Sequence, residues 1–173
     1  MAWQMANAVK WCQDNIGNYR GDKDQLFLTG HSAGGHLVAL ISTHPKYGID
    51  PKAISGVILN DAAALDMHHY LLEHPPTNEK YYLTTWTDDP NVWMEASPIN
   101  FVNKDSPPFM MYLGAKTYPS IKTGYERFLK VLKPLQPEVA PILLNRKHIP
   151  MVTQYFLPWN KRYKEIVEFI RYR

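Results

Sequence analysis

The most constraining feature of this 173-residue chain is a short apolar run that leads directly into a glycine-rich turn. Residues 25–29 (QLFLT) have the length and composition of a buried strand, and Gly30-His31-Ser32-Ala33-Gly34 follows at once. Residues 33–43 then have the pattern of a helix. The sequence therefore predicts a strand, a tight turn and a helix packed back on that strand, which is the building unit of a parallel sheet.

The rest of the chain continues this alternation. Apolar runs at 53–59 and 109–113 predict buried strands, and the second follows a Pro-Pro pair that disfavours a helix. A fourth strand is expected at 140–144. Helices are expected from residue 2 to near Gly17, at 125–132 and around 163–170. This order predicts an α/β fold, a mostly parallel sheet with flanking helices.

The length favours a single domain covering 1–173, since a chain of this size can bury a real core. Residues 62–104 are too irregular for one long helix, because prolines and aromatic residues interrupt them, and we expect a lid-like insertion over the sheet. The aromatic residues of this segment would either wall an apolar pocket or serve ordinary packing, and they are Tyr81, Tyr82, Trp86 and Trp93.

Charge and hydropathy argue against several kinds of partner. The chain has 19 Lys and Arg against 16 Asp and Glu, scattered rather than gathered in a stripe, so nucleic-acid binding is not expected. We find neither an apolar run of about 18 residues nor a basic-then-apolar N-terminus, so neither a membrane span nor a signal peptide is expected. A cytoplasmic location is the default expectation, with export left open if the true N-terminus lies upstream.

Cysteine and histidine usage predicts no metal site. Cys12 is the only cysteine, so the chain can form neither an internal disulfide nor a thiolate metal centre. The histidine spacings do not combine with acidic residues in the manner of a metal site. His31 and His36 flank the turn at residue 32 and are expected to pack or to line a pocket.

The turn itself carries the chemistry. Gly30 to Gly34 match G-x-S-x-G between a strand and a helix, the context in which that pattern presents a nucleophilic serine. Ser32 would be held in a strained backbone conformation, and we expect that a Cβ at Gly30 or Gly34 would collide with the neighbouring strand and helix. The N–H of Ala33, at the start of the helix, would bind a developing oxyanion. These features predict acyl transfer at Ser32.

A longer stretch resembles a known family. The sequence DKDQLFLTGHSAGGHLVAL resembles the nucleophile-elbow region of the esterase/lipase branch of the α/β-hydrolases, such as carboxylesterases and arylformamidase-like enzymes. The resemblance continues through GVILNDAAALDM, Ser97-Pro98, PPFMMYLG and a late histidine. It implies a serine hydrolase that needs no cofactor, with His148 as general base.

The resemblance also implies that the four strands are the second half of the family's fold. The first half, with its HGGG-like loop that supplies a second oxyanion donor, is then absent. The strand that carries Ser32 would have a free apolar edge. We therefore expect either association with another copy of the chain or a missing N-terminal segment that covers this edge.

The triad acid is the open point. The family usually places its acid a few residues beyond Gly114, where this chain has Thr117, and no carboxylate follows until Glu126. Asp61, at the end of the preceding strand, is the candidate, although an Asp there often caps a helix or binds loop amides. Asp66 is a weaker candidate and a better fit to a cap.

Two functions follow from this pattern. The first is a serine hydrolase that cleaves a small-molecule carboxylic ester, or an activated amide, through an acyl-enzyme on Ser32. The alternative is an impaired hydrolase-like protein that binds a ligand or partner through the old active-site cleft. Thr117 and the absent oxyanion loop favour the alternative, whereas the intact turn and His148 oppose it.

Overall fold

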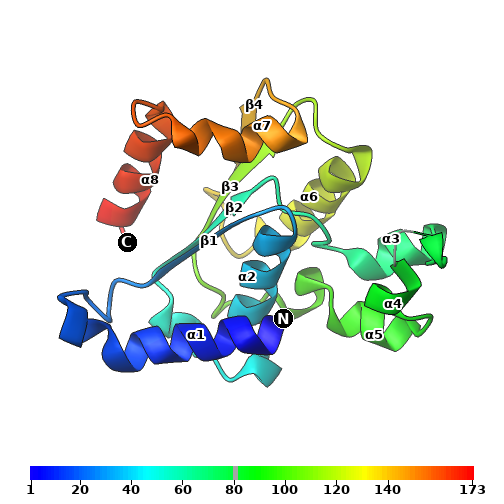
Figure 1. Ribbon diagram of the computed structural model, residues 1–173, viewed down its shortest axis with the longest axis horizontal. Coiled ribbons are helices and arrows are strands. Elements are labelled where there is room, and N and C mark those ends of the chain that lie inside the picture. Colours follow the sequence, from blue (N-terminus) through cyan, green and yellow to red (C-terminus); the bar gives the residue numbers. More distant parts are fainter. Residues whose placement is uncertain (80–81) are drawn as a thin grey trace.

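The computed structural model describes residues 1–79 and 82–173, and in this part of the chain four strands form one parallel sheet flanked by helices (Figure 1). The strands lie side by side in sequence order and are β1 (Phe27–His31), β2 (Gly56–Asn60), β3 (Phe109–Gly114) and β4 (Pro141–Leu144). Leu59 lies opposite Gly30 on one side and Met111 on the other. The predicted α/β fold class is confirmed.

Two strands are displaced from their expected positions. β1 starts two residues late and continues through Gly30 and His31, so the strand ends immediately before Ser32. β2 starts at Gly56 instead of residue 53, because Pro51–Ala53 forms a turn of 3₁₀-helix, η3, whose first backbone position suits proline.

The helices of the described residues surround this sheet. The α-helices are α1 (Ala2–Asn15), α2 (Ala33–Thr43), α3 (Met67–Glu73), α4 (Tyr82–Trp86), α5 (Pro90–Glu95), α6 (Pro119–Leu132), α7 (His148–Thr153) and α8 (Lys161–Arg171). Short 3₁₀-helices join them and include η1 (Ile16–Tyr19), η2 (Pro45–Tyr47), η5 (Pro98–Phe101) and η6 (Gln154–Phe156). Helix α6 starts six residues earlier than expected, with Pro119 in its first turn.

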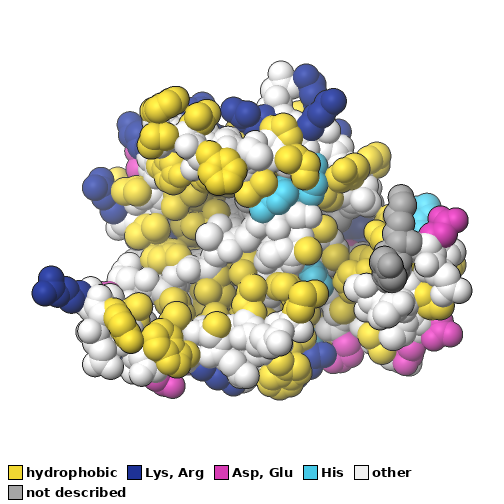
Figure 2. All heavy atoms as spheres, viewed as in Figure 1, with side chains coloured by type: hydrophobic (Ala, Val, Ile, Leu, Met, Phe, Trp, Pro, Cys, Tyr) yellow, Lys and Arg dark blue, Asp and Glu magenta, His cyan; other side chains and the backbone are white. Residues whose placement is uncertain are grey.

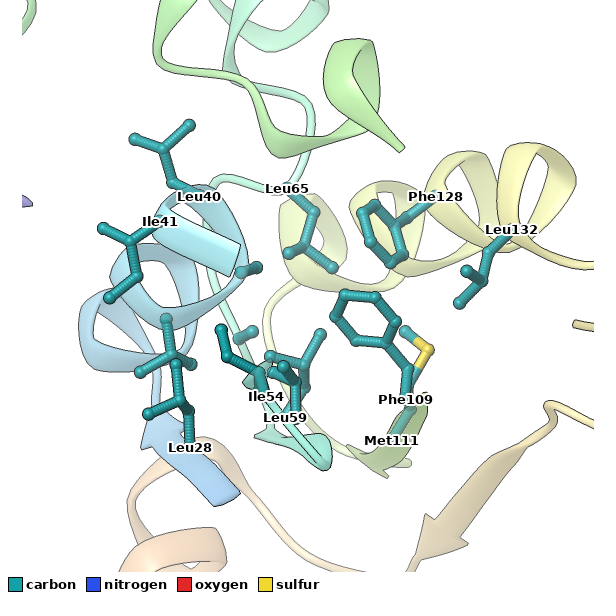
Figure 3. Packing of buried hydrophobic residues seen from close by; sticks show 14 of the residues in the cluster. Leu28, Leu40, Ile41, Ile54, Leu59, Leu65, Phe109, Met111, Phe128 and Leu132 are labelled. Atoms are coloured by element: carbon teal, nitrogen blue, oxygen red, sulfur yellow. The ribbon is translucent and has the colours of Figure 1, made fainter. Parts of the chain in front are cut away.

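Successive residues of β2 face opposite sides of the sheet and so define two cores. Val57 and Leu59 belong to the larger core, which contains buried residues of α1, α2 and α6. Figure 3 shows this packing, with Phe128 of α6 beside Phe109 of β3. Ile58 points the other way, into a smaller core with residues of α7 and α8. The site therefore rests on a sheet that is covered on both faces.

The described part of residues 62–104 contains the short α-helices α3, α4 and α5, with a small core of their own. Met67 and Leu71 of α3 pack with Trp93 of α5 in a cluster separate from the two cores of the sheet. Trp93 also donates from its indole Nε1 to the backbone oxygen of Trp86, at 2.8 Å. In Figure 1 these helices project to one side of the sheet, beyond α6 and α2.

The strand β1 lies at the end of the sheet order and pairs with β2. On the face shown in Figure 2, hydrophobic side chains line the hollow between α1 and the α7–α8 region. Association of this edge with another chain stays a prediction. Among the described residues, every helix is too short or too polar to cross a membrane.

His36 ties helix α2 to the end of α5 and should make stability depend on pH. Its Nε2 lies 2.7 Å from the backbone oxygen of Ala96, and the side chain is buried. Burial lowers the pKa of His36 below its ordinary value. The unfolded chain therefore takes up this proton first as pH falls, and the free energy of unfolding decreases below about pH 6.5.

We expect His36→Gln to reduce this pH dependence. The slope of the free energy of unfolding against pH should be smaller by up to about 1.4 kcal/mol per pH unit, the value for one proton. Urea unfolding of both proteins between about pH 5 and pH 8 measures it. Equal slopes in the two proteins would show that His36 does not contribute.

Candidate active site

The site is built on the turn between β1 and α2. Ser32 has φ 54° and ψ −121°, a conformation that costs free energy for a residue with a side chain. Hydrogen bonds hold it there, since its N–H donates to the oxygen of Asn60 at 3.3 Å and its own oxygen accepts from Ala63 at 3.0 Å. β2 and the loop after it therefore fix the turn, and the Ser32 side chain remains partly exposed.

The glycines of the turn do not share the steric role that the sequence predicted. A Cβ at Gly30 would overlap the backbone of Gly34 and come within 2.5 Å of the nitrogen of Gly35, so the prediction for Gly30 is confirmed. The prediction for Gly34 is wrong, because a Cβ there would meet nothing within 4 Å. The next residue is the crowded one, since a Cβ at Gly35 would lie 2.6 Å from the Cβ of Ala62.

Three side chains from different parts of the chain meet at this turn. The Ser32 hydroxyl lies 2.9 Å from Nε2 of His148, and Nδ1 of the same ring lies 2.6 Å from Oδ2 of Asp61. The Asp61 side chain is fully buried and that of His148 is 11% exposed. A protonated Nδ1 can therefore donate to the carboxylate while Nε2 accepts from the serine, which is the arrangement of a serine nucleophile with its base and acid.

The backbone at Asp61, like that at Ser32, has a positive φ and is fixed by hydrogen bonds. Asp61 has φ 51°, and its N–H donates to the oxygen of Tyr112 at 2.9 Å. The next N–H, of Ala62, donates to the hydroxyl of Tyr125, which in turn donates to the same Tyr112 oxygen. The fully buried Tyr125 of α6 thus bridges β3 and the turn that presents the carboxylate.

Comparisons with known proteins place the chain in a family. The family model BD-FAE matches residues 3–119, which is more than half of the chain. The chain belongs to the BD-FAE family. It is 32% identical over 138 residues to esterase LipQ of Mycobacterium tuberculosis (strain ATCC 25618 / H37Rv), covering 69% of this chain and 31% of LipQ. Esterase LipC of the same organism is 28% identical, covering 63% of this chain and 30% of LipC.

Solved structures resemble the chain over almost all of its length. A truncated form of a carbohydrate esterase from gut microbiota superposes with a TM-score of 0.74 at 20% identity, covering 98% of this chain and 68% of that one. The carboxylesterase Cest-2923 from Lactobacillus plantarum WCFS1 gives a TM-score of 0.64 at 20% identity, covering 94% and 60%. The fold is that of the α/β-hydrolases, and the chain spans just under a third of the length of LipQ and LipC.

The two acidic alternatives have separate positions in this BD-FAE chain. Asp61 contacts His148, and its other oxygen, Oδ1, accepts from the N–H of Gly114 at 2.8 Å. Asp66 caps helix α3 by accepting from the N–H of His69 at 3.2 Å, and it pairs with Arg127. The expectation that Asp66 is a cap is confirmed. Asp61 therefore combines the two roles that the sequence left open for it, since it accepts from a backbone amide and also contacts His148.

His31 packs against His148, which is one of the two roles expected for it. Its ring is tilted against that of His148 with centroids 4.5 Å apart, and its Nε2 lies 3.0 Å from the His148 backbone oxygen. Burial lowers the pKa of His31, which favours the neutral ring, with its Nε2–H donating to that oxygen. No spacing in the sequence pointed to this contact, because His31 and His148 are brought together by the sheet.

His31, Asp61 and His148 also form a cluster whose ligand-type atoms lie within 4.8 Å of one another. Among the described residues this is the one group of three or more such side chains. The Asp61 and His148 atoms already bond to each other, and His148 also bonds to Ser32. These hydrogen bonds, with that of His31 to the His148 backbone, account for the arrangement, and the expectation of a chain without a metal site stays a prediction.

A pocket of about 920 Å³ opens in front of Ser32. Ser32, Ala33 and His148 lie on its wall together with residues of α3, α4 and α6. Of the aromatic residues expected to line a pocket, Tyr82 and Trp86 do so, whereas Trp93 is buried in the small core of α3 and α5. Tyr81 lies outside the described residues. His36 also lines the pocket, as expected, from the first turn of α2.

Proposed function

We propose that this chain carries the active site of a carboxylic ester hydrolase that works through an acyl-enzyme on Ser32. The observation that supports it best is the continuous hydrogen-bonded series from Asp61 through His148 to Ser32. The relatives named esterases support the same reaction class.

The chemistry follows from the positions of the three side chains. His148 Nε2 accepts the proton of the Ser32 hydroxyl as the oxygen attacks the acyl carbon, and Asp61 stabilises the resulting imidazolium. The imidazolium then protonates the leaving alcohol. Water attacks the acyl-enzyme, His148 takes its proton, and the acid leaves from Ser32 with that proton returned to the hydroxyl.

The carbonyl oxygen of the substrate gains negative charge when Ser32 attacks and again when water attacks, so it needs a hydrogen-bond donor. Ala33 is the first residue of the 11-residue helix α2, and an α-helix leaves its first N–H groups without an intrahelical acceptor. The positive end of the helix therefore lies beside Ser32, where it favours an oxyanion. We assign this donor role to the Ala33 N–H.

The residues that line the pocket indicate which kind of substrate group binds there. Tyr82 and Trp86 of α4 and Tyr118 at the start of α6 give it an aromatic wall, which suits an apolar or aryl group. We assign residues 62–104 the role of a cover over this pocket. The contact between Asp61 and His148 supports the hydrolase over the rival reading of a binding protein without turnover, which rested partly on Thr117 at the usual acid position.

A fluorophosphonate probe tests the proposal. The purified protein is expected to gain one probe per chain at Ser32, because the activated hydroxyl displaces fluoride from phosphorus and stays covalently bound. Ser32→Ala should gain none, and the nearby Ser120→Ala, which also changes a serine of the pocket, should react as the unchanged protein does. Intact-mass spectrometry and peptide mapping measure this. Labelling that persists in Ser32→Ala, or is absent from the unchanged protein, contradicts the proposed function.

A further inference from the structure

We propose that Thr117 is a positioning residue that fixes the carboxylate of Asp61 for His148. The inference rests on the proposed function and assigns a role to the residue that stands where the acid was expected. The Thr117 hydroxyl lies 2.5 Å from Oδ2 of Asp61, the oxygen that also contacts His148. It lies 3.5 Å from Nδ1 of His148 itself.

The Asp61 carboxylate accepts three hydrogen bonds. We assign to the Thr117 bond the role of fixing the position of Oδ2, the oxygen that faces His148. Oδ1 is held by the backbone N–H of Gly114, while Oδ2 accepts from Thr117 and His148. The Asp61 side chain is fully buried, so water does not reach it to replace a lost donor. Without the hydroxyl, the histidine would be the sole side chain orienting Oδ2, although the carboxylate has to orient the histidine.

The Thr117 hydroxyl is itself held in place. Thr117 is buried, and its N–H donates to the oxygen of Gly114 at 3.1 Å in the turn that follows β3. A β-branched side chain has few χ1 rotamers, so this backbone contact also restricts the direction of the hydroxyl. β3 therefore ends in two donors to one carboxylate, the Gly114 N–H and the Thr117 hydroxyl.

Glycine is needed at residue 114 for a neighbouring backbone and not for the carboxylate. A Cβ there would lie 2.8 Å from the backbone oxygen of Arg146, which is a clash, and 3.4 Å from Oδ1 of Asp61, which is an ordinary contact. The end of β3 therefore receives the acid presented by β2 through its two donors, the Gly114 N–H and the Thr117 hydroxyl. This explains how a chain with threonine at the position usual for the acid still brings a carboxylate to His148.

Three substitutions at Thr117 test this role, with p-nitrophenyl acetate as substrate. Thr117→Val keeps the shape without the hydroxyl, Thr117→Ala removes both, and Thr117→Ser keeps the hydroxyl. We expect kcat to fall on the order of tenfold in Thr117→Val with KM within about twofold, as for loss of a hydrogen bond to a charged group. Thr117→Ser should recover most of the loss. Titration of Ser32 with the fluorophosphonate normalises each rate to the folded, active fraction.

The pH profile separates positioning from a structural role. In Thr117→Val the acid limb of kcat/KM is expected to move to higher pH, because a carboxylate with one donor fewer holds the imidazolium proton of His148 more strongly. Thr117→Ala should show the same shift if Thr117→Val does not fold. Equal losses in the serine and valine variants, or an unchanged kcat and pH profile without the hydroxyl, would overturn the inference. An unchanged protein that neither labels nor turns over would instead defeat the proposed function.

Discussion

Asp61→Asn is expected to lower kcat/KM about 10⁴-fold, the size of effect found when a triad loses its carboxylate but keeps its shape. The asparagine can still accept from Gly114, so the fold should survive, but a neutral amide neither fixes the tautomer of His148 nor stabilises its charged form. Steady-state hydrolysis of p-nitrophenyl acetate, normalised to folded protein, measures the loss.

Asp66→Asn is the matched control for this substitution. It changes an acid that lines the pocket, caps α3 and pairs with Arg127 without contacting His148. We expect it to change kcat/KM only a few-fold, since a cap or a partly exposed ion pair contributes on the order of 1 kcal/mol. Comparable losses in the two variants, or a tenth or more of the activity left in Asp61→Asn, would remove Asp61 from the triad.

A second carboxylate position can be tested in the same background. The Thr117 hydroxyl oxygen lies 3.5 Å from His148 Nδ1, so an acid at residue 117 would reach the same ring atom. The double variant Asp61→Asn with Thr117→Asp is therefore expected to regain on the order of tenfold over Asp61→Asn alone. This recovery would show that the loss in Asp61→Asn reflects missing acid chemistry and not a damaged fold.

The sequence predicted the four strands of a parallel sheet because buried parallel strands are short apolar runs, and four such runs were present. It misplaced the start of α6, where Pro119 and Gly124 look like helix breakers. Proline is tolerated in a first turn, and Gly124 sits mid-helix where a Cβ would approach only Leu65, at 4.0 Å. From composition alone, proline and glycine at these positions look like breaks in a helix, but the tertiary packing allows α6 to include both.

The site was predictable as far as chain order fixes it. Ser32 follows from a pattern tied to a strand and a helix, and His148 follows from the family resemblance and its place in the chain. Asp61 was the candidate acid, but the sequence left a capping role open for it, because β2 and β3 are adjacent and parallel and residues after either strand can reach the same histidine. Side-chain length and the hydrogen bond between Asp61 and Thr117 decide between them, and neither is visible in spacing.

The glycines of the turn show the same limit at atomic scale. Sequence reasoning placed the steric constraint at Gly34 by symmetry about Ser32, but α2 turns through about 100° per residue, so its first residues point in different directions. Gly35 points toward the loop after β2, where it faces Ala62, whereas Gly34 faces open space. Only the orientation of the helix on the sheet distinguishes two adjacent glycines.

Alanine at each of these glycines should therefore give opposite results. Gly30→Ala is expected to lower the free energy of unfolding by about 3 kcal/mol or more, because the new Cβ would overlap the backbone of Gly34, which cannot rotate away as a side chain would. Gly34→Ala is expected to raise it by up to about 1 kcal/mol, since alanine favours the helix and meets no neighbour.

Urea unfolding at 25 °C compares the three alanine variants with the unchanged protein. Gly35→Ala should lie between the other two, at about 1 to 3 kcal/mol of destabilisation, because its Cβ would meet a single methyl group that can shift with the Ala62 backbone. Because Ala62 adjoins Asp61, that shift should also weaken turnover in the folded protein. If Gly30→Ala and Gly34→Ala have the same stability, close approach of strand and helix does not set the shape of the turn at Ser32.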